Sequence, residues 1–448
     1  MSLSSTPSDV AAGRLSQAEY ARNFADAHPP LTAVQALLEA ERCYYCFDAP
    51  CTVACPTGID IPSFIARIAQ GNLRGAARTI LEENVLGGMC ARVCPTEVLC
   101  EQACVRCTQE DKPVEIGALQ RHATDAYFAQ PGTPLFTRAP ASGKRVAVVG
   151  AGPAGLSCAH RLAMLGHAVT LFDDKPKLGG LNEYGLATYK TVDGFAQKEI
   201  DWLLSIGGIT VRAQHSLGRD MFLDALVEDY DAVFLGLGLA GVNTLGMPQP
   251  ADAAARAAVD FIAELRQAAS PAEVPVGRRV VVIGGGMTAV DAAVQSKLLG
   301  AEDVTMVYRR GPEAMSASTY EQQWAQKNGV RIKHWGAPQQ MLLADGQVRG
   351  VRFARMALQG ERLADTGESF DIEADTVLTA IGQVFEAQPL GLALDLKGGR
   401  IATAADGQTS HPKVWAGGDC RYGGRDLTVE AVEHGKVAAI AIDRQLRA

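Results

Sequence analysis

One pattern constrains the fold more than any other: a strand, a glycine-rich turn, a helix and a second strand, which occurs twice in the chain. In the first copy a buried strand at 146–149 is followed by a helix at 153–165 and a strand at 168–172 that ends in Asp173. The turn has the G-x-G-x-x-G spacing, with Gly150, Gly152 and Gly155. Glycines let the backbone approach a pyrophosphate at the helix N-terminus, and the acid accepts hydrogen bonds from a ribose. This copy predicts a dinucleotide-binding domain.

The second copy differs at the end of its second strand. Its turn and third small position are Gly284, Gly286 and Ala289. The following strand at 304–308 runs into Arg309 and Arg310, with no acid there. A basic pair can hold the 2′-phosphate of NADP, whereas an acid favours NAD. The two arginines can equally be solvated side chains, so NADH and NADPH both stay open.

After the second copy the chain returns to the first domain. A strand and glycine turn occupy 376–383, and a strand at 414–420 contains Gly418 and Asp419. Asp419 is a candidate for a flavin ribityl chain, and a helix beginning near Thr428 would aim its positive N-terminus at the isoalloxazine, which favours reduced anionic flavin. Two dinucleotide sites in one chain are typical of a flavin and a nicotinamide. We therefore predict an α/β protein with two Rossmann-like domains, the NAD(P) domain inserted in the FAD domain.

Nine of the 11 cysteines precede both glycine turns. They form two groups: Cys43, Cys46, Cys51 and Cys55, followed by Pro56, and then Cys90, Cys94, Cys100, Cys104 and Cys107. Disulfides, structural zinc and iron–sulfur clusters all use cysteine at such density. The polar, alanine-rich first 30 residues do not resemble a secretory leader, and a reducing compartment disfavours disulfides.

Zinc is also a poorer match to this spacing. Zinc sites favour two Cys-x2-Cys pairs or pairs completed by histidine, but the region has one such pair and none of the eight histidines. The run Cys-x2-Cys-x4-Cys-x3-Cys-Pro is a stretched form of the ferredoxin pattern, in which the fourth cysteine serves a second cluster. We predict two [4Fe–4S] clusters, which take eight ligands.

The cysteines belong to a predicted helical domain. Apolar residues recur at helical spacing in two groups: Leu31, Val34, Leu37 and Leu38, and then Phe64, Ile65 and Ile68. A linker rich in Pro, Gly, Ser and Thr follows at 129–144. The predicted domains are the helical cluster domain at 1–140, the first part of the FAD domain at 141–270, the NAD(P) domain at 271–385 and the second part of the FAD domain at 386–448.

Charge and hydropathy restrict the partners. The net charge of -8 argues against nucleic acid or an anionic membrane as the principal partner. No run of about 18 apolar residues occurs, so no membrane span is expected. We expect a soluble, cytoplasmic protein.

Together these motifs resemble the glutamate synthase small-subunit-like flavoproteins across nearly the whole chain. The resemblance is carried by the cysteine arrangement, VVGAGPAGL, the paired Gly179 and Gly180, VIGGGMTAVDAA and AGGD. Within that family, CPTEVLCEQAC followed by IGALQ looks most like the N-terminal half of dihydropyrimidine dehydrogenase and its separate bacterial NAD-dependent subunit. The resemblance implies FAD, NADH or NADPH, and two [4Fe–4S] clusters.

The resemblance also implies a ligand set. One cluster would be held by Cys43, Cys46, Cys51 and Cys104, and the other by Cys55, Cys94, Cys100 and Gln120. Thiolate is the better iron ligand, so chemistry alone would place Cys90 or Cys107 in the eighth position. The resemblance leaves these two as packing thiols. Because the glutamate synthase branch has glutamate where Gln120 stands, Gln120 favours pyrimidine reduction.

Further cofactor residues follow from the same resemblance. FAD would contact Gly150 to Gly155, Asp173, Gly179, Gly180, Lys190, Leu217, Asp419 and Thr428. The nicotinamide site would include Met287, Thr288, Ala289, Arg309, Arg310, Ala380, Ile381 and Gly382. Lys190 replaces the family's arginine but keeps its charge. Ser316 stands where a further arginine for the 2′-phosphate is expected, which weakens the case for NADP, and Ser318 with Glu321 has the spacing of a helix capping box.

These expectations describe an NAD(P)-dependent oxidoreductase that is the electron-input subunit of a dihydropyrimidine dehydrogenase. Hydride would pass from NAD(P)H to FAD, and single electrons would leave through the clusters. No acid–base catalytic residue is expected, and His160, His167, His411 and His434 are expected to be packing or surface residues. Pyrimidine reduction needs a second flavin in a (β/α)8 barrel of about 250 residues, for which the chain has no room. A separate FMN-containing catalytic subunit in a heterotetramer is therefore expected.

Three alternatives stay open. The chain could be the small subunit of glutamate synthase or of a related ferredoxin–NADP reductase-type complex. It could be a stand-alone NAD(P)H oxidoreductase with a small acceptor, or a non-enzymatic redox sensor or scaffold with degenerate loops. Neither the reaction direction nor the pyrimidine, uracil or thymine, is fixed by the sequence.

Overall fold

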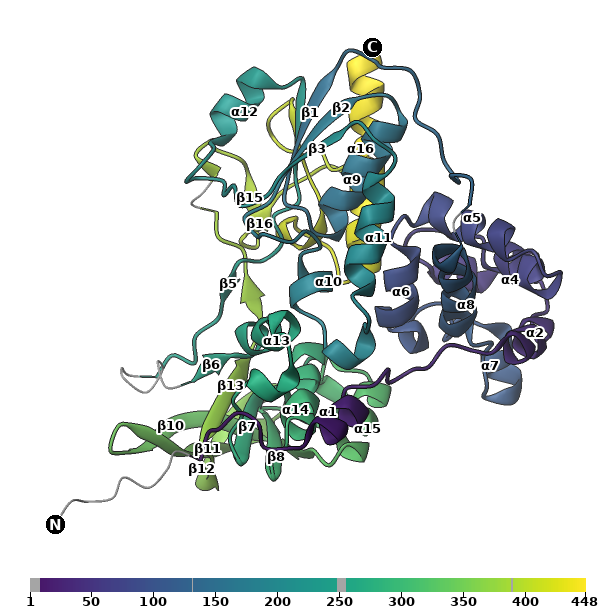
Figure 1. Ribbon diagram of the computed structural model, residues 1–448. Helices are drawn as coiled ribbons and strands as arrows, with labels where there is room; N and C mark the ends of the chain where they lie inside the picture. The colour runs from purple at the N-terminus through teal and green to yellow at the C-terminus, as the bar shows by residue number, and fades with distance from the viewer. Residues whose placement is uncertain (1–8, 131, 248–254, 388–389) are drawn as a thin grey trace. The chain divides into compact units, whose positions relative to one another are not determined.

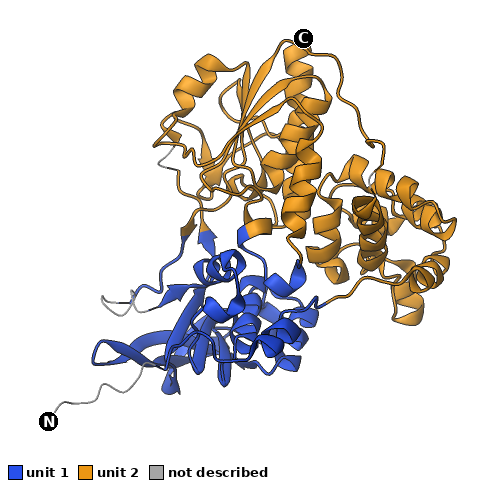
Figure 2. Ribbon diagram, viewed as in Figure 1, with its two compact units in different colours: residues 1–27, 184–192, 242–383 blue, residues 28–183, 193–241, 384–448 orange. Residues whose placement is uncertain are grey.

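The computed structural model describes residues 9–130, 132–247, 255–387 and 390–448. It divides into two units (Figure 2): unit 1 comprises 1–27, 184–192 and 242–383, and unit 2 comprises 28–183, 193–241 and 384–448. The segment 242–383 is thus inserted between two parts of unit 2, which is the predicted insertion of the NAD(P) domain in the FAD domain. Across the described ranges, no helix combines the length and apolarity needed to cross a membrane.

The helical part of unit 2 carries the nine clustered cysteines (Figure 1). Its helices are α2 (Ala33–Glu41), α3 (Pro50–Ala54), α4 (Ile61–Ala69), α5 (Leu73–Glu83), α6 (Gly87–Val93), η1 (Thr96–Val98), α7 (Val105–Glu110) and α8 (Ile116–Ala129). Phe64, Ile65 and Ile68 lie in its core, as their spacing predicts. Helix α2 buries Ala36 and Ala40, whereas Val34 and Leu38 are 68% and 60% exposed.

The second part of unit 2 is a five-stranded parallel sheet in the order β17-β4-β1-β2-β3. The strands are β1 (Arg145–Val149), β2 (Ala168–Phe172), β3 (Ile209–Arg212), β4 (Ala232–Leu235) and β17 (Val414–Ala416). Its helices are α9 (Pro153–Met164), α10 (Leu181–Tyr184), α11 (Phe195–Leu204), α12 (Leu223–Asp229) and α16 (Thr428–Arg447), and a short hairpin joins β15 (Leu396–Lys397) to β16 (Arg400–Ile401). Strand β17 shows the predicted return of the chain.

Unit 1 contains a second five-stranded parallel sheet, in the order β6-β13-β7-β8-β9. Its strands are β6 (Arg256–Ala257), β7 (Arg279–Gly284), β8 (Asp303–Tyr308), β9 (Arg331–His334) and β13 (Thr376–Ala380), with helices α13 (Ala258–Gln267), α14 (Met287–Leu298) and α15 (Thr319–Lys327). An antiparallel meander of β10 (Gly336–Ala344), β11 (Gln347–Gln359) and β12 (Arg362–Glu373) was not predicted. Short strands β5 (Gly241–Val242) and β14 (Gln383–Val384) lie where the chain leaves and re-enters unit 2.

Two limits of unit 1 differ from the predicted domain limits. Its main segment begins at Val242 rather than at 271, because β6 pairs with β13 and α13 contributes to the same core. Residues 9–27 also belong to it rather than to the cluster domain. Helix α1 (Gln17–Asn23) buries Tyr20 in this core, and Ala11 forms a bridge with Val276.

Candidate functional site

The first glycine turn is a closely packed cradle between β1 and α9. A Cβ atom on Gly155 would collide with the carbonyl oxygen of Gly150, and a Cβ on Gly150 would collide with that of Gly236. Gly180 has φ of +53°, and its Cβ would lie 2.8 Å from Gly152 Cα. Neighbouring Gly179 also has a positive φ, +126°. The absence of side chains leaves the amides at the N-terminus of α9 open to an anion such as a pyrophosphate.

Asp173 connects this turn to the end of β2. Its carboxylate accepts the N–H of Ala151 at 2.6 Å and that of Lys175 at 2.9 Å. Burial raises its pKa. Since a carboxylate has about four lone-pair positions, these two bonds leave room for the predicted ribose contact.

The end of β17 and the start of α16 bring together the other predicted flavin residues of unit 2. Gly418 has φ of +72°, and its N–H donates to His434 Nδ1 at 3.2 Å. Burial raises the pKa of Asp419 to about 6. Thr428, the first residue of α16, donates its hydroxyl to Asn182 Oδ1 at 2.9 Å. Leu217 packs against the apolar cluster that includes Phe172, Leu223 and Cys420.

Lys190 is not grouped with these residues. It belongs to unit 1, where its buried ammonium lies 2.8 Å from Asp291 Oδ1 and 3.0 Å from Glu321 Oε1. The Ser318 hydroxyl accepts a hydrogen bond from the Glu321 N–H at 3.2 Å, as expected for a helix cap. The Glu321 carboxylate accepts a hydrogen bond from Lys190. The three charged residues are far apart in sequence, so no local pattern predicts this cluster.

The second glycine turn has the same close packing. A Cβ on Gly284 would collide with the carbonyl of Ala380, so the turn after β7 touches the end of β13, where Ile381 and Gly382 follow. Gly285 faces the ring of Tyr308, and a Cβ on Gly286 would lie 3.0 Å from Ser316 Oγ. The first turn of α14 is formed by Met287, Thr288 and Ala289. The predicted nicotinamide residues are therefore neighbours in unit 1.

Arg309 and Arg310 follow β8 beside this turn and are exposed. Among the residues that the structure describes, neither guanidinium has a hydrogen-bond or ion-pair partner. Ser316, which replaces an expected arginine, lies next to Gly286. Two cationic side chains are thus available to an anion at this edge of the sheet.

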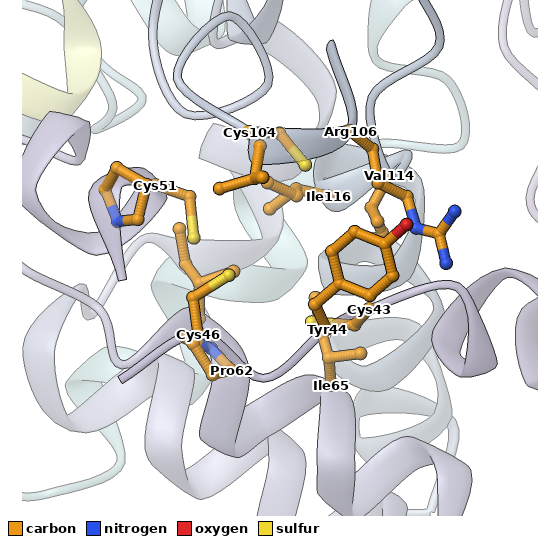
Figure 3. Close-up of a pocket in the computed structure, with 13 residues that line it drawn as sticks. Cys43, Tyr44, Cys46, Cys51, Pro62, Ile65, Cys104, Arg106, Val114 and Ile116 are labelled. Carbon is orange, nitrogen blue, oxygen red and sulfur yellow. The ribbon is translucent and has the colours of Figure 1, made fainter. Parts of the chain in front are cut away.

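Four of the predicted cluster ligands line one cavity in the helical part of unit 2. Figure 3 shows the sulfurs of Cys46, Cys51 and Cys104 turned toward the space between them, with Cys43 on the opposite wall. The remaining wall is mainly apolar and includes Ile65. Burial raises the pKa of the Cys51 thiol to about 11, so a thiolate there needs a bound cation. An iron cluster supplies that charge.

A second cavity is lined by Cys55, Cys90, Cys94, Cys100 and Gln120. Gln120 Nε2 donates to the carbonyl of Gly87 at 2.7 Å, which leaves its oxygen as the free coordinating atom. The space at the two cavities, including the part that is open to solvent, is about 380 Å³ in the first and about 370 Å³ in the second, so the two are similar in size. Cys107 lines neither cavity.

The donor set fits a cluster better than a single ion. A hydrogen bond with Cys90 and burial raise the pKa of Cys94, and burial raises that of Cys100, so both need a cation to ionise. Within the described ranges, no three or more His, Cys, Asp or Glu side chains converge as a single metal ion requires. A [4Fe–4S] cluster instead binds its four ligands at four separate irons.

Helix α16 joins the predicted flavin site to the second cavity. Val429, the residue after Thr428, lines that cavity. Further along α16, the buried Lys436 donates to the carbonyl of Thr57 at 2.9 Å and pairs with Glu83 at 2.8 Å. No local pattern predicts these contacts, because α16 and the cysteines are more than 300 residues apart.

Two family patterns match the chain. Residues 20–131 match the domain described as dihydropyrimidine dehydrogenase domain II, 4Fe-4S cluster. Residues 144–435 match the family described as pyridine nucleotide-disulphide oxidoreductase. The predicted iron–sulfur domain, the predicted FAD and NAD(P) cofactors and the fold class are therefore confirmed.

Curated relatives extend over nearly the full chain. The NAD-dependent dihydropyrimidine dehydrogenase subunit PreT of Escherichia coli K12 is 34% identical, over 93% of this chain and 96% of that one. The glutamate synthase [NADPH] small chain of the same organism is also 34% identical, over 94% of this chain and 93% of that one. Among solved structures, the oxidoreductase FprA of Mycobacterium tuberculosis superposes with a TM-score of 0.56 at 19% identity, over 69% of this chain and 85% of that one, which shows a shared fold.

Proposed function

Because this chain belongs to the pyridine nucleotide-disulphide oxidoreductase family and carries a 4Fe–4S domain of the dihydropyrimidine dehydrogenase type, we propose that it is the electron-input subunit of a dihydropyrimidine dehydrogenase. It is an NAD(P)H-dependent flavin and iron–sulfur oxidoreductase. The proposed final acceptor is a pyrimidine, uracil or thymine, bound by a separate FMN-containing subunit. The proposed assembly is a heterotetramer.

The observation that carries the proposal is that helix α16 links the predicted flavin site to the second of two cysteine-lined cavities. The chemistry that a bound FAD would supply is acceptance of hydride from a reduced nicotinamide and release of single electrons toward the clusters. Thr428, a predicted flavin residue that donates its hydroxyl to Asn182, is adjacent on α16 to Val429, which lines the second cavity. Ile61 lines both cavities, so the two are neighbours in the helical part of unit 2. This adjacency supports a route outward through both clusters.

We assign the ligands as the resemblance implies. The first cavity would use Cys43, Cys46, Cys51 and Cys104, and the second Cys55, Cys94, Cys100 and Gln120. The bond from Gln120 Nε2 to Gly87 supports the glutamine, because it orients the amide oxygen for iron. Cys90 lines the same cavity and is the alternative fourth ligand.

The cofactor-contact residues are proposed on the same basis. For FAD these are the glycines of the first turn with Asp173, Leu217, Gly418, Asp419 and Thr428, and for the nicotinamide the first turn of α14 with Arg309, Arg310 and residues 380–382. Close packing at Gly155 and Gly284 supports both sets, since it keeps each turn free of side chains. The free guanidinium groups of Arg309 and Arg310 support a contact with the 2′-phosphate of NADPH, so NADPH is a candidate beside NADH.

A second candidate function is the small subunit of glutamate synthase. It is favoured by the 34% identity to that chain in Escherichia coli K12, which equals the identity to PreT. Two features favour pyrimidine reduction: the match of residues 20–131 to a dihydropyrimidine dehydrogenase domain, and Gln120 in place of the glutamate of the glutamate synthase branch.

The test is anaerobic co-expression with candidate FMN-containing barrel subunits, followed by co-purification. Oxidation of NADH and of NADPH is measured with uracil, with thymine, and with glutamine plus 2-oxoglutarate. The proposal predicts that a barrel subunit co-purifies and that a pyrimidine stimulates oxidation of one nucleotide. A large amidotransferase partner with glutamine-dependent oxidation would overturn it, as would full turnover of a small acceptor by the chain alone.

A further inference from the structure

Asn84 is a fully buried amide in the wall of the second cavity. It follows α5, has 0% of its surface exposed, and lines the cavity together with the cysteines. Its Oδ1 accepts the N–H of Leu86 at 3.1 Å, which fixes the plane of the amide. Its Nδ2 is buried and has no hydrogen-bond partner among the described residues. One end of this side chain is thus bound, and the other is not.

An unpaired buried N–H donor is uncommon in folded proteins, because it loses its bonds to water without replacement. The cavity offers few oxygen acceptors: apart from Thr96 and Gln120, its other lining residues are cysteine, proline, glycine or aliphatic. The Gln120 oxygen is the atom proposed to bind iron, since Nε2 donates to the Gly87 carbonyl. The abundant acceptors are sulfur atoms, those of Cys55, Cys94 and Cys100 and those of a cluster bound between them.

The first cavity has no such group. Its lining includes no asparagine or glutamine, and its one cationic side chain, Arg106, lies over the Tyr44 ring at 4.0 Å and is bonded to the carbonyl of Arg42 and the carboxylate of Glu110. The two cavities are similar in size and cysteine content but differ in this amide. A difference between the clusters is therefore expected.

We propose that Asn84 Nδ2 donates an N–H···S hydrogen bond to the cluster in the second cavity and raises its reduction potential. Reduction adds one negative charge to the cluster, and a hydrogen bond to a more negative sulfur is stronger, so the donor stabilises the reduced form. Asn84 would tune the cluster through its hydrogen bond to sulfur and would not contact a substrate. The inference rests on the two proposed clusters but not on the identity of the final acceptor.

The test is potentiometric titration of the purified, fully loaded chain, followed by electron paramagnetic resonance. In Asn84→Leu, which has a similar shape but no donor, the ratio of reduced to oxidised second cluster at fixed potential should fall about tenfold, which is about 59 mV for one electron. Ile59→Val is the matched control, because Ile59 lines the same cavity and carries no donor. Its potential should equal that of the wild type, and the first cluster should be unchanged in both variants.

A second measurement uses the wild-type chain, so it does not depend on assembly of the variant. With ¹⁵N-labelled asparagine, the reduced second cluster should show a ¹⁵N hyperfine coupling that is absent without the label, since Asn84 is the one asparagine lining the cavity. If the chain holds eight irons, an unchanged potential in Asn84→Leu or the absence of a ¹⁵N coupling would overturn only the proposed role of Asn84. Four irons per chain would overturn the pair of clusters as well.

Discussion

The buried cluster of Lys190, Asp291 and Glu321 gives the sharpest test of a residue role. The resemblance assigns Lys190 to FAD, but the structure pairs its ammonium with two carboxylates at 2.8 and 3.0 Å inside unit 1. Its side chain is 11% exposed, and those of the two acids are 3% and 12% exposed. Lys190→Met would remove the ammonium that pairs with both buried carboxylates.

Removing one partner of a buried ion pair costs about 3–5 kcal/mol. For a domain of this size about 1 kcal/mol lowers the melting temperature by about 2–4 °C, so we expect unit 1 of Lys190→Met to melt about 6–20 °C lower.

The assay is thermal unfolding followed by circular dichroism and flavin fluorescence. Lys198→Met is the control, since Lys198 is exposed on α11 and the same change there should shift melting little. Combining Lys190→Met with Asp291→Asn and Glu321→Gln should recover most of the loss. Wild-type melting together with loss of FAD in Lys190→Met would refute the ion-pair role and support the flavin contact.

Three further changes test other parts of the molecule. Gly155→Ala should yield protein without flavin absorbance, because the new Cβ collides with the Gly150 carbonyl; retained FAD would contradict the packing of this turn. Gln120→Ala should change the electron paramagnetic resonance of the second cluster, while Cys90→Ser should leave that spectrum unchanged; the reverse result would make Cys90 the ligand. Burial lowers the pKa of His160 to about 3, so below pH 6.5 the unfolded chain binds a proton that the folded chain does not. The free energy of unfolding should therefore fall between pH 6.5 and 3, by up to about 5 kcal/mol at about 1.36 kcal/mol per pH unit. His160→Gln should flatten this dependence in pH-series denaturation, and an equally steep curve would exclude His160 as its source.

Local pattern was sufficient for the two dinucleotide-binding sheets. The predicted strand at 168–172 is β2, and the helix predicted at 153–165 is α9, which ends at Met164. These elements have strong signals because parallel strands are buried on both faces and the glycine turns tolerate no side chain. Eight of the nine clustered cysteines line the two cavities, although the sequence pattern alone did not divide them between the two.

Other features depended on contacts that no local pattern contains. The apolar spacing of α2 predicted a helix but not which of its faces is covered, and Val34 and Leu38 are exposed. The meander β10–β12 is largely exposed and polar, so its strands lack a clear alternation. Lys190 pairs with Asp291 and Glu321, which are 101 and 131 positions away in the sequence. Asn84 lines the second cavity only because α5 and α8 pack together in the fold. Such pairs follow from tertiary structure.

The central claim is that electrons leave the flavin through the cysteine-bound clusters. The most direct measurement compares wild type and Cys51→Ser in the complex with the barrel subunit, using nicotinamide oxidation with uracil and, separately, with a dye that accepts electrons at the flavin. The proposed route predicts that Cys51→Ser keeps dye reduction and loses uracil-dependent oxidation. Undiminished uracil-dependent oxidation in Cys51→Ser would contradict it.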